Sequence, residues 1–224
     1  MNRWKAELAL GSNAVIWGVT FVLVKGALRD ISPVLFLVLR FSLAAVALGA
    51  LYRWKWRVPK AHRVTGKMLA AASLIGVFLF AGYLLQTVGL KSTTAPKSAF
   101  LTGLATVMVP LLAALVYQIK PRSLEAAGVL AATLGMGLMT LEGPIGSIGR
   151  GDLLTFGGAI AFSAHIVATG HFAEQIGYEV LSITQIGAAA LSALSLVWWV
   201  ETPRIQWHPL VVWAILITGL FCTA

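Results

Sequence analysis

The chain is poor in charge and has almost no cysteine. Only 11% of its 224 residues are charged, whereas 58% are hydrophobic, and the mean hydropathy is +0.86. Cys222 is the single cysteine, which excludes a disulfide within the chain and a cysteine metal cluster. A soluble domain of this size could not bury so much apolar surface, so the composition predicts a polytopic membrane protein.

Sequence motifs for ATP-driven work and for catalysis are also missing. The chain has no Gly-x-x-x-x-Gly-Lys-Ser/Thr phosphate loop, which excludes an ATP motor of its own. Ser163 and His165 are two positions apart, so on one helix they diverge by about 200° and cannot pair as nucleophile and base. The histidines show no metal-ligand spacing, and we expect neither a metal nor another cofactor. An intramembrane enzyme is therefore the weakest functional hypothesis.

The acidic residues all lie near the ends of apolar runs or between them. They are Glu7, Asp30, Glu125, Glu142, Asp152, Glu174, Glu179 and Glu201. Carboxylate proton relays of the kind that pumps use therefore have no obvious member at mid-membrane. If transport is coupled to protons, His165 is the one clear titratable candidate in the core, because imidazole titrates near neutral pH.

Apolar runs long enough to cross a bilayer fill most of the chain. About 18 to 20 apolar residues in a helix span the hydrocarbon core. We predict helices because the runs lack the alternation of barrel strands. The predicted spans are 8–28, 33–53, 67–89, 95–118, 124–141, 152–173, 179–200 and 209–224. The predicted fold class is therefore all-α and polytopic, with eight transmembrane helices.

The net charge of +9 reflects membrane topology and does not indicate nucleic-acid binding. Ten Lys and Arg residues precede the first span or lie in the second and fourth loops, and five lie in loops on the other side. This bias predicts a cytoplasmic N-terminus and a place in the inner cell membrane. The basic segment Met1–Glu7 runs into an apolar stretch without a cleavage site, so we interpret it as the start of the first helix.

The chain contains an internal repeat. A shift of 145 residues places the first two spans on the sixth and seventh, and it aligns Ile31 with Ile176. One repeat holds five helices, and an odd number means that the second copy enters the membrane from the opposite side. We expect a first repeat at 8–141 and a second at 152–224 that stops in its third helix. Inverted repeats are a common build of secondary transporters.

Several segments of the first repeat resemble a known family. AVIWGVTFVLVK at 14–25, DISP at 30–33 and LRF at 39–41 are similar to the opening of an EamA-type transporter, in the drug/metabolite transporter superfamily. The third and fourth helices of that family resemble the segments GYLLQTVGL at 82–90, TA at 94–95, AFLTGL at 99–104 and VPLL at 109–112. The resemblance covers the whole chain and is most specific over residues 14–110.

This resemblance implies ten helices in two inverted repeats, both termini in the cytoplasm, and export or exchange of small metabolites. Substrates in the family range from amino acids to drugs and sugar phosphates. The chain departs from the family at the end of the fourth helix, where many members carry Gly-Glu and this chain has QIKP at 118–121. The resemblance therefore assigns to no residue of this chain a role that depends on that glutamate.

Arg40 is the sharpest candidate for a binding residue. It lies about 12 Å along the second span, at about 1.5 Å per residue. A charge at that depth costs about 2.5–3.5 kcal/mol on insertion scales, so it should face protein or water and find a partner. We predict that it binds an anionic substrate group, such as a carboxylate. A structural tether to backbone carbonyls or a polar neighbour is the alternative.

Other polar and aromatic residues share helical faces. Asn13, Trp17 and Thr20 lie on one face of the first span at i, i+4 and i+7. Tyr83 and Gln86 share a face of the third span. Both sets suit a substrate cavity, and ordinary packing between helices is the alternative for each.

The second repeat carries its own polar pair. At the repeat shift, His165 corresponds to Thr20 and Gln185 corresponds to Arg40. A buried histidine can carry a proton or bind substrate, and a structural histidine in the core is an equal alternative.

The remaining polar candidates have more ordinary interpretations. Lys25 lies near the outer end of its span, and its long side chain favours an interfacial position over a gating role. Ser98 and Thr102 share a face of the fourth span and favour hydrogen bonds between helices.

A secondary transporter or exporter of small metabolites or drugs is the first functional hypothesis, with amino-acid-like or anionic solutes among its substrates. The expected partners are the lipid bilayer and a small-molecule substrate, and a homodimer is the one protein complex considered. A non-transporting assembly subunit or a truncated relic is the alternative, because the second repeat stops early.

Overall fold

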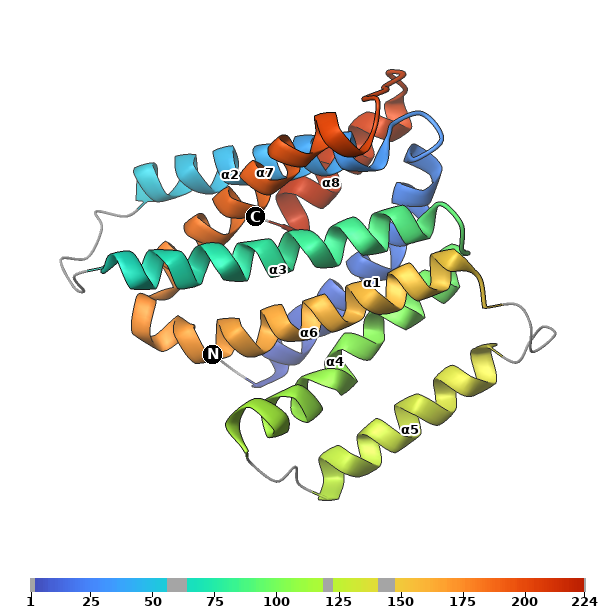
Figure 1. Ribbon diagram of the computed structural model, residues 1–224, viewed down its shortest axis with the longest axis vertical. Coiled ribbons are helices and arrows are strands. Elements are labelled where there is room, and N and C mark those ends of the chain that lie inside the picture. Colours follow the sequence, from blue (N-terminus) through green and yellow to red (C-terminus); the bar gives the residue numbers. More distant parts are fainter. Residues whose placement is uncertain (1–2, 56–63, 119–122, 141–147, 224) are drawn as a thin grey trace.

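Eight helices lie within the part of the chain that the computed structural model describes, which is residues 3–55, 64–118, 123–140 and 148–223 (Figure 1). They are α1 (Arg3–Ala27), α2 (Pro33–Lys55), α3 (Gly66–Leu90), α4 (Ala95–Tyr117), α5 (Ser123–Thr140), α6 (Arg150–Ile176), α7 (Tyr178–Val200) and α8 (Pro209–Phe221). The prediction of an all-α polytopic protein is confirmed, and each predicted span coincides with one helix.

Five of these helices, α2, α3, α4, α6 and α7, are long and apolar enough to cross a membrane. The described apolar stretches in the other three are shorter, at Val15–Ala27, Ala126–Gly135 and Pro209–Phe221. Several residues behind the predictions lie outside the described part of the chain: Arg57, Lys60, His62, Arg63, Lys120, Arg122 and Glu142.

Helix α3 lies at the centre of the bundle (Figure 1). It packs mainly against α6 and α7, while α2 packs against α7 and α8. Helix α4 covers α6 and also contacts α1, and α5 lies at the edge against α4. Contacts between the two predicted repeats therefore make most of the core.

Two glycines let α3 and α8 approach their neighbours closely. A Cβ atom on Gly76 of α3 would lie 2.2 Å from the carbonyl oxygen of Gln185 in α7. A Cβ atom on Gly219 of α8 would lie 3.2 Å from the carbonyl oxygen of Arg40 in α2. Small residues at helix crossings in membranes allow such backbone contact. Arg40 and Gln185 correspond at the repeat shift, so the two glycines pack against corresponding positions.

We expect Gly76→Ala to destabilise the α3–α7 contact strongly. The new methyl group would meet a backbone carbonyl that cannot rotate away, and overpacking of this kind costs about 1–3 kcal/mol. Thermal unfolding in detergent measures the effect. Gly49→Ala is the matched control, because a Cβ atom there meets nothing within 4 Å. Equal midpoints for the two variants would contradict the close packing.

One end of the bundle is closed by contacts between loops. We call it the distal end; α1, α3 and α7 finish there and α2, α4, α6 and α8 begin there. Ile31 and Ile205 form an isolated antiparallel bridge between the α1–α2 and α7–α8 connections. The backbone N–H of Ser32 donates to the carbonyl oxygen of Arg204 at 2.9 Å. These bonds satisfy backbone groups that would otherwise face the bilayer boundary unpaired.

Exposed tryptophans lie at two levels of the molecule. Trp4 and Trp54 are exposed near the N-terminus and the end of α2. Trp198, Trp199 and Trp207 are exposed at the distal end, and Trp213 is exposed in the first part of α8. Tryptophan is typical of membrane–water interfaces, so this separation suits a bundle that spans a bilayer.

Candidate functional site

A cavity of about 640 Å³ lies among α1, α3, α4, α6 and α7. Its walls include the aromatic rings of Trp17, Tyr83 and Phe162 and the polar side chains of His165 and Gln185. Mostly apolar walls with a few convergent polar groups are typical of small-molecule sites, which range over about 300–1,000 Å³. The structure thus brings candidate residues from both halves of the chain to one space.

His165 and Gln185 face each other across the α6–α7 boundary. The Nε2 atom of His165 lies 3.1 Å from Oε1 of Gln185, which accepts a hydrogen bond when that nitrogen carries the proton. Thr169 Oγ1 lies 3.5 Å from the same nitrogen. The pair therefore presents a fixed imidazole to the cavity.

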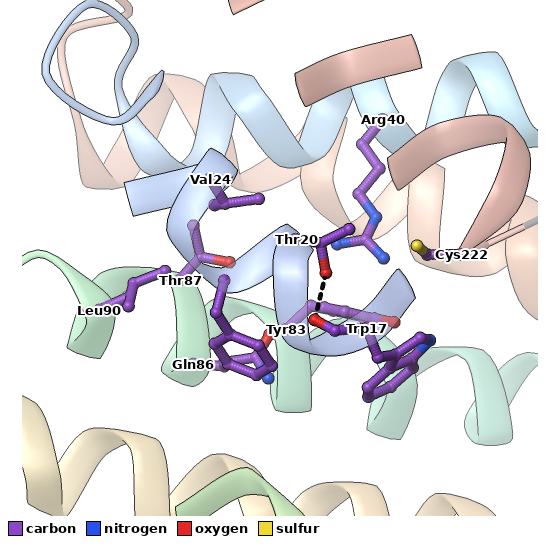
Figure 2. Close-up of a pocket in the computed structure, with 10 residues that line it drawn as sticks. Trp17, Thr20, Val24, Arg40, Tyr83, Gln86, Thr87, Leu90 and Cys222 are labelled. Atoms are coloured by element: carbon purple, nitrogen blue, oxygen red, sulfur yellow. Dashed lines mark hydrogen bonds between the residues drawn. The ribbon is translucent and has the colours of Figure 1, made fainter. Parts of the chain in front are cut away.

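A narrow pocket of about 20 Å³ adjoins this cavity, and Figure 2 shows the residues that line it. The two spaces share Trp17, Phe21, Tyr83 and Cys222. The narrow pocket continues along α1 and α3 as far as Leu90. It therefore points from the middle of the bundle toward the distal end.

Arg40 supplies the charge of the narrow pocket. It is buried, at 5% exposure, and its guanidinium points from α2 into the space beside Thr20 and Cys222 (Figure 2). Its Nε–H donates to Thr223 Oγ1 at 2.8 Å, and its Cζ lies 4.0 Å from the centre of the Tyr83 ring. The cation–π contact and the hydrogen bond offset part of the cost of burying this charge.

Tyr83 is held in place by other rings. Its ring packs edge-on against Phe41, with centroids 5.6 Å apart, and against Phe162, with centroids 4.8 Å apart. Gly82 next to it leaves room for the Phe162 ring, since a Cβ atom on Gly82 would lie 2.7 Å from that ring. Aromatic pairs in this geometry fix side-chain orientation, so Tyr83 positions the guanidinium as well as lining both spaces.

Asn13, Trp17 and Thr20 were predicted to share one face of α1, and the structure describes the side chains of the last two. Trp17 lines both spaces, and Thr20 is buried with its hydroxyl donating to the Trp17 carbonyl at 2.7 Å (Figure 2). The side chain of Asn13 lies outside the described part of the chain.

Hydrogen bonds between helices involve Gln86 and Thr102. Gln86 Nε2 donates to Thr102 Oγ1 at 2.9 Å, which joins α3 to α4 and confirms the linking role predicted for Thr102. Gln86 lines the narrow pocket as well. Ser98 differs from the prediction, since its buried hydroxyl has no hydrogen-bond partner among the described residues.

Lys25, near the end of α1, is held by backbone carbonyls at the distal end. Its Nζ donates to the carbonyl oxygen of Leu90 at 2.9 Å and also to that of Thr93. Leu90 is the last residue of α3 and Thr93 lies in the turn that follows, and a cation is favourable at a helix end because the last carbonyls lack backbone partners. Lys25 therefore joins α1 to the end of α3, and its interfacial position stays a prediction.

A cluster of charged and polar side chains at the distal end was not predicted from the sequence. Asp152 is buried near the start of α6, and its Oδ2 lies 2.6 Å from Lys97 Nζ of α4. It also accepts from the Thr93 hydroxyl and from the backbone N–H of Gly149 at 3.0 Å. We call Lys25, Thr93, Lys97 and Asp152 the distal polar cluster. It ties α1, α4 and α6 to the α3–α4 turn.

The sequence did not predict two of the residues that line these spaces. Thr87 follows Gln86 and lies one helical turn after Tyr83. Helical spacing from Tyr83 therefore places Thr87 on the same face of α3 and could have predicted it. Cys222 lines both spaces, but it follows the end of α8 and carries no pattern that signals a site. Within the described residues, no three His, Cys, Asp or Glu side chains gather as ligands for a metal ion.

The match to a known family decides the class of this protein. A model described as the EamA-like transporter family matches residues 4–141. The chain belongs to the EamA-like transporter family. Similar curated proteins are two uncharacterized transporters of Archaeoglobus fulgidus. One is 32% identical and aligns with 100% of this chain and 67% of its own length. The other is 26% identical, over 98% and 76%.

Further comparisons agree with this assignment. The uncharacterized transporter YyaM of Bacillus subtilis is 26% identical, over 88% of this chain and 66% of its own length. A crystal structure that is 21% identical superposes with a TM-score of 0.66, over 97% of this chain and 75% of the other. That likeness shows the helical fold. This member of the EamA-like family is thus a multi-pass membrane protein whose named relatives are transporters, which points away from an enzyme.

Proposed function

We propose that the protein is a secondary transporter that moves small organic solutes with an anionic group across the inner membrane by alternating access. The observation that carries the proposal is the cavity of about 640 Å³ together with the adjoining narrow pocket, which shares Trp17, Phe21, Tyr83 and Cys222 with it and holds the buried guanidinium of Arg40. Its apolar walls suit the body of a solute, and Arg40 suits a carboxylate. The chemistry favours solutes that are amphipathic, such as amino-acid-like molecules.

We propose that two inverted repeats, 8–141 and 152–224, form this cavity between them. The close packing of Gly76 on Gln185 and of Gly219 on Arg40 supports the repeat, because both glycines meet corresponding positions. The candidate residues then fall into two corresponding groups, one around Arg40 and one around His165 and Gln185. Sites at the interface of such repeats are common in transporters.

The distal polar cluster is proposed as the outer closure of the transport path. The narrow pocket ends at Leu90, whose carbonyl accepts from Lys25. The Lys97–Asp152 ion pair closes the neighbouring α4–α6 boundary. With a cytoplasmic N-terminus, the distal end faces outward, so solute release requires these contacts to separate. Lys25 then has a gating role through its backbone partners.

Solute uptake into proteoliposomes, combined with labelling of Cys222, tests the proposal. Cys222 is the single cysteine and lines the cavity, so a maleimide reports on one site, and Cys222→Ser is the blank. We expect saturable uptake of carboxylate-bearing solutes and slower labelling when those solutes are present. Neutral and cationic solutes of equal size serve as controls. If no solute is taken up and none protects Cys222, a non-transporting assembly subunit becomes the better interpretation.

A further inference from the structure

The guanidinium of Arg40 has more donors than the structure uses. A guanidinium carries five N–H groups, and among the described residues one of them, on Nε, has a hydrogen-bond acceptor in Thr223. The Tyr83 ring covers one face of the group. The terminal nitrogens have no acceptor within the described part of the chain and lie beside the narrow pocket (Figure 2). A buried cation with unused donors requires a ligand or water.

The narrow pocket offers donors and no counter-charge. None of the ten described residues that line it is acidic. The nearby carboxylate of Asp152 is engaged with Lys97 and Thr93 at the distal end. Thr87 is 2% exposed and lines this pocket. A hydroxyl and a guanidinium with unused donors line the same pocket, and together they are a donor set for an anion.

The size of the pocket limits what it holds. Its volume of about 20 Å³ exceeds the roughly 10–15 Å³ that one water-sized species requires. A single atom or small ion fits, whereas an organic acid does not fit as a whole. One negative charge neutralises Arg40, and a divalent anion would leave an excess charge in an apolar environment. These limits favour a monovalent anion of halide size.

We propose that the narrow pocket is a binding site for one chloride-sized monovalent anion, held by the Arg40 guanidinium and the Thr87 hydroxyl. The anion compensates the buried charge while the wide cavity is empty. The proposed function adds one consequence: a solute carboxylate that reaches Arg40 from the cavity displaces the anion, so chloride and solute compete. Binding of the anion itself does not depend on transport.

Equilibrium binding of radiolabelled chloride to the purified protein, in gluconate buffer of constant ionic strength, tests the site. We expect one chloride per chain and a rise of about 2–4 °C in the unfolding midpoint at saturation. Arg40→Gln should weaken binding at least about tenfold, and Thr87→Val by about three- to tenfold. Thr87→Ser keeps the hydroxyl and should bind like the wild type. Arg53→Gln removes an exposed arginine at the other end of α2 and is the charge-matched control.

The outcomes separate this proposal from the proposed function. Absence of chloride binding in the wild type would mean that water occupies the pocket, and it would overturn the anion site while leaving transport untouched. Binding that survives both Arg40→Gln and Thr87→Val would place the ion elsewhere and also overturn it. Chloride binding without solute uptake would support the site and count against the transporter. Displacement of the label by a transported carboxylate supports both.

Discussion

Proteoliposomes that contain Arg40→Gln are expected to lose uptake of carboxylate solutes by about 100-fold or more, since a hydrogen-bonded charge pair is worth about 1.5–3 kcal/mol per bond. The guanidinium is the one charged group that borders the narrow pocket, so no described side chain in that pocket can replace it. Glutamine retains polarity and approximate length, so membrane insertion should be unchanged.

Two further variants make the Arg40 result specific. Arg40→Lys keeps the charge but loses the planar fork and the stacking on Tyr83, so we expect uptake to fall between wild type and Arg40→Gln. Arg53→Gln should transport normally because that side chain is exposed. Unfolding midpoints of all variants in detergent check that the proteins remain folded. Uptake by Arg40→Gln at the wild-type rate would remove Arg40 from the binding site.

Asp152→Asn is expected to produce the largest loss of stability at the distal end. The carboxylate is buried and receives three hydrogen bonds, from Lys97, Thr93 and the Gly149 backbone. An amide cannot accept all three and removes the charge that faces Lys97. Breaking a buried ion pair costs about 3–5 kcal/mol, and the partial exposure of Lys97, at 24%, reduces this to about 2–3 kcal/mol.

Thermal unfolding of Asp152→Asn, Lys97→Met and the double variant measures the ion pair directly. We expect a coupling energy of about 1–2 kcal/mol between the two sites. Because the cluster is the proposed outer closure, Asp152→Asn should also speed labelling of Cys222 by a membrane-impermeant maleimide added from the distal side. Glu201→Gln is the control, since Glu201 caps α2 through the Leu35 N–H at the same end without an ion pair among the described residues. Additive effects of the two variants would show that the pair contributes nothing.

The proposed mechanism joins these two regions. The guanidinium lies at the middle of the bundle, and the narrow pocket leads from it to the carbonyl that Lys25 holds. A solute bound at Arg40 therefore lies directly below the closure. Separation of the distal contacts would open this route, and their reformation would close it, as alternating access requires.

The hydrophobic pattern of the sequence determined the eight helices, because the length of an apolar run and the position of its flanking charges are local properties. The pattern also identified Arg40 as a candidate, because a charged residue inside an apolar run can be recognised from the sequence without knowing its contacts in the fold. The stripes with Trp17, Tyr83 and Gln86 followed from helical periodicity in the same way. Trp17 and Tyr83 line both the cavity and the narrow pocket, whereas Gln86 lines the narrow pocket alone, and this placement depends on how the helices pack.

Only the tertiary structure decided which partners these side chains have. Lys25 and Asp152 lie near helix ends, where the sequence favours solvated charges, yet both are held by residues of other helices. Thr87 and Cys222 belong to the pocket because α1, α2, α3 and the end of α8 meet there. Such contacts join residues far apart in the chain, and their geometry depends on how closely the helices cross, which Gly76 and Gly219 allow but no local pattern specifies.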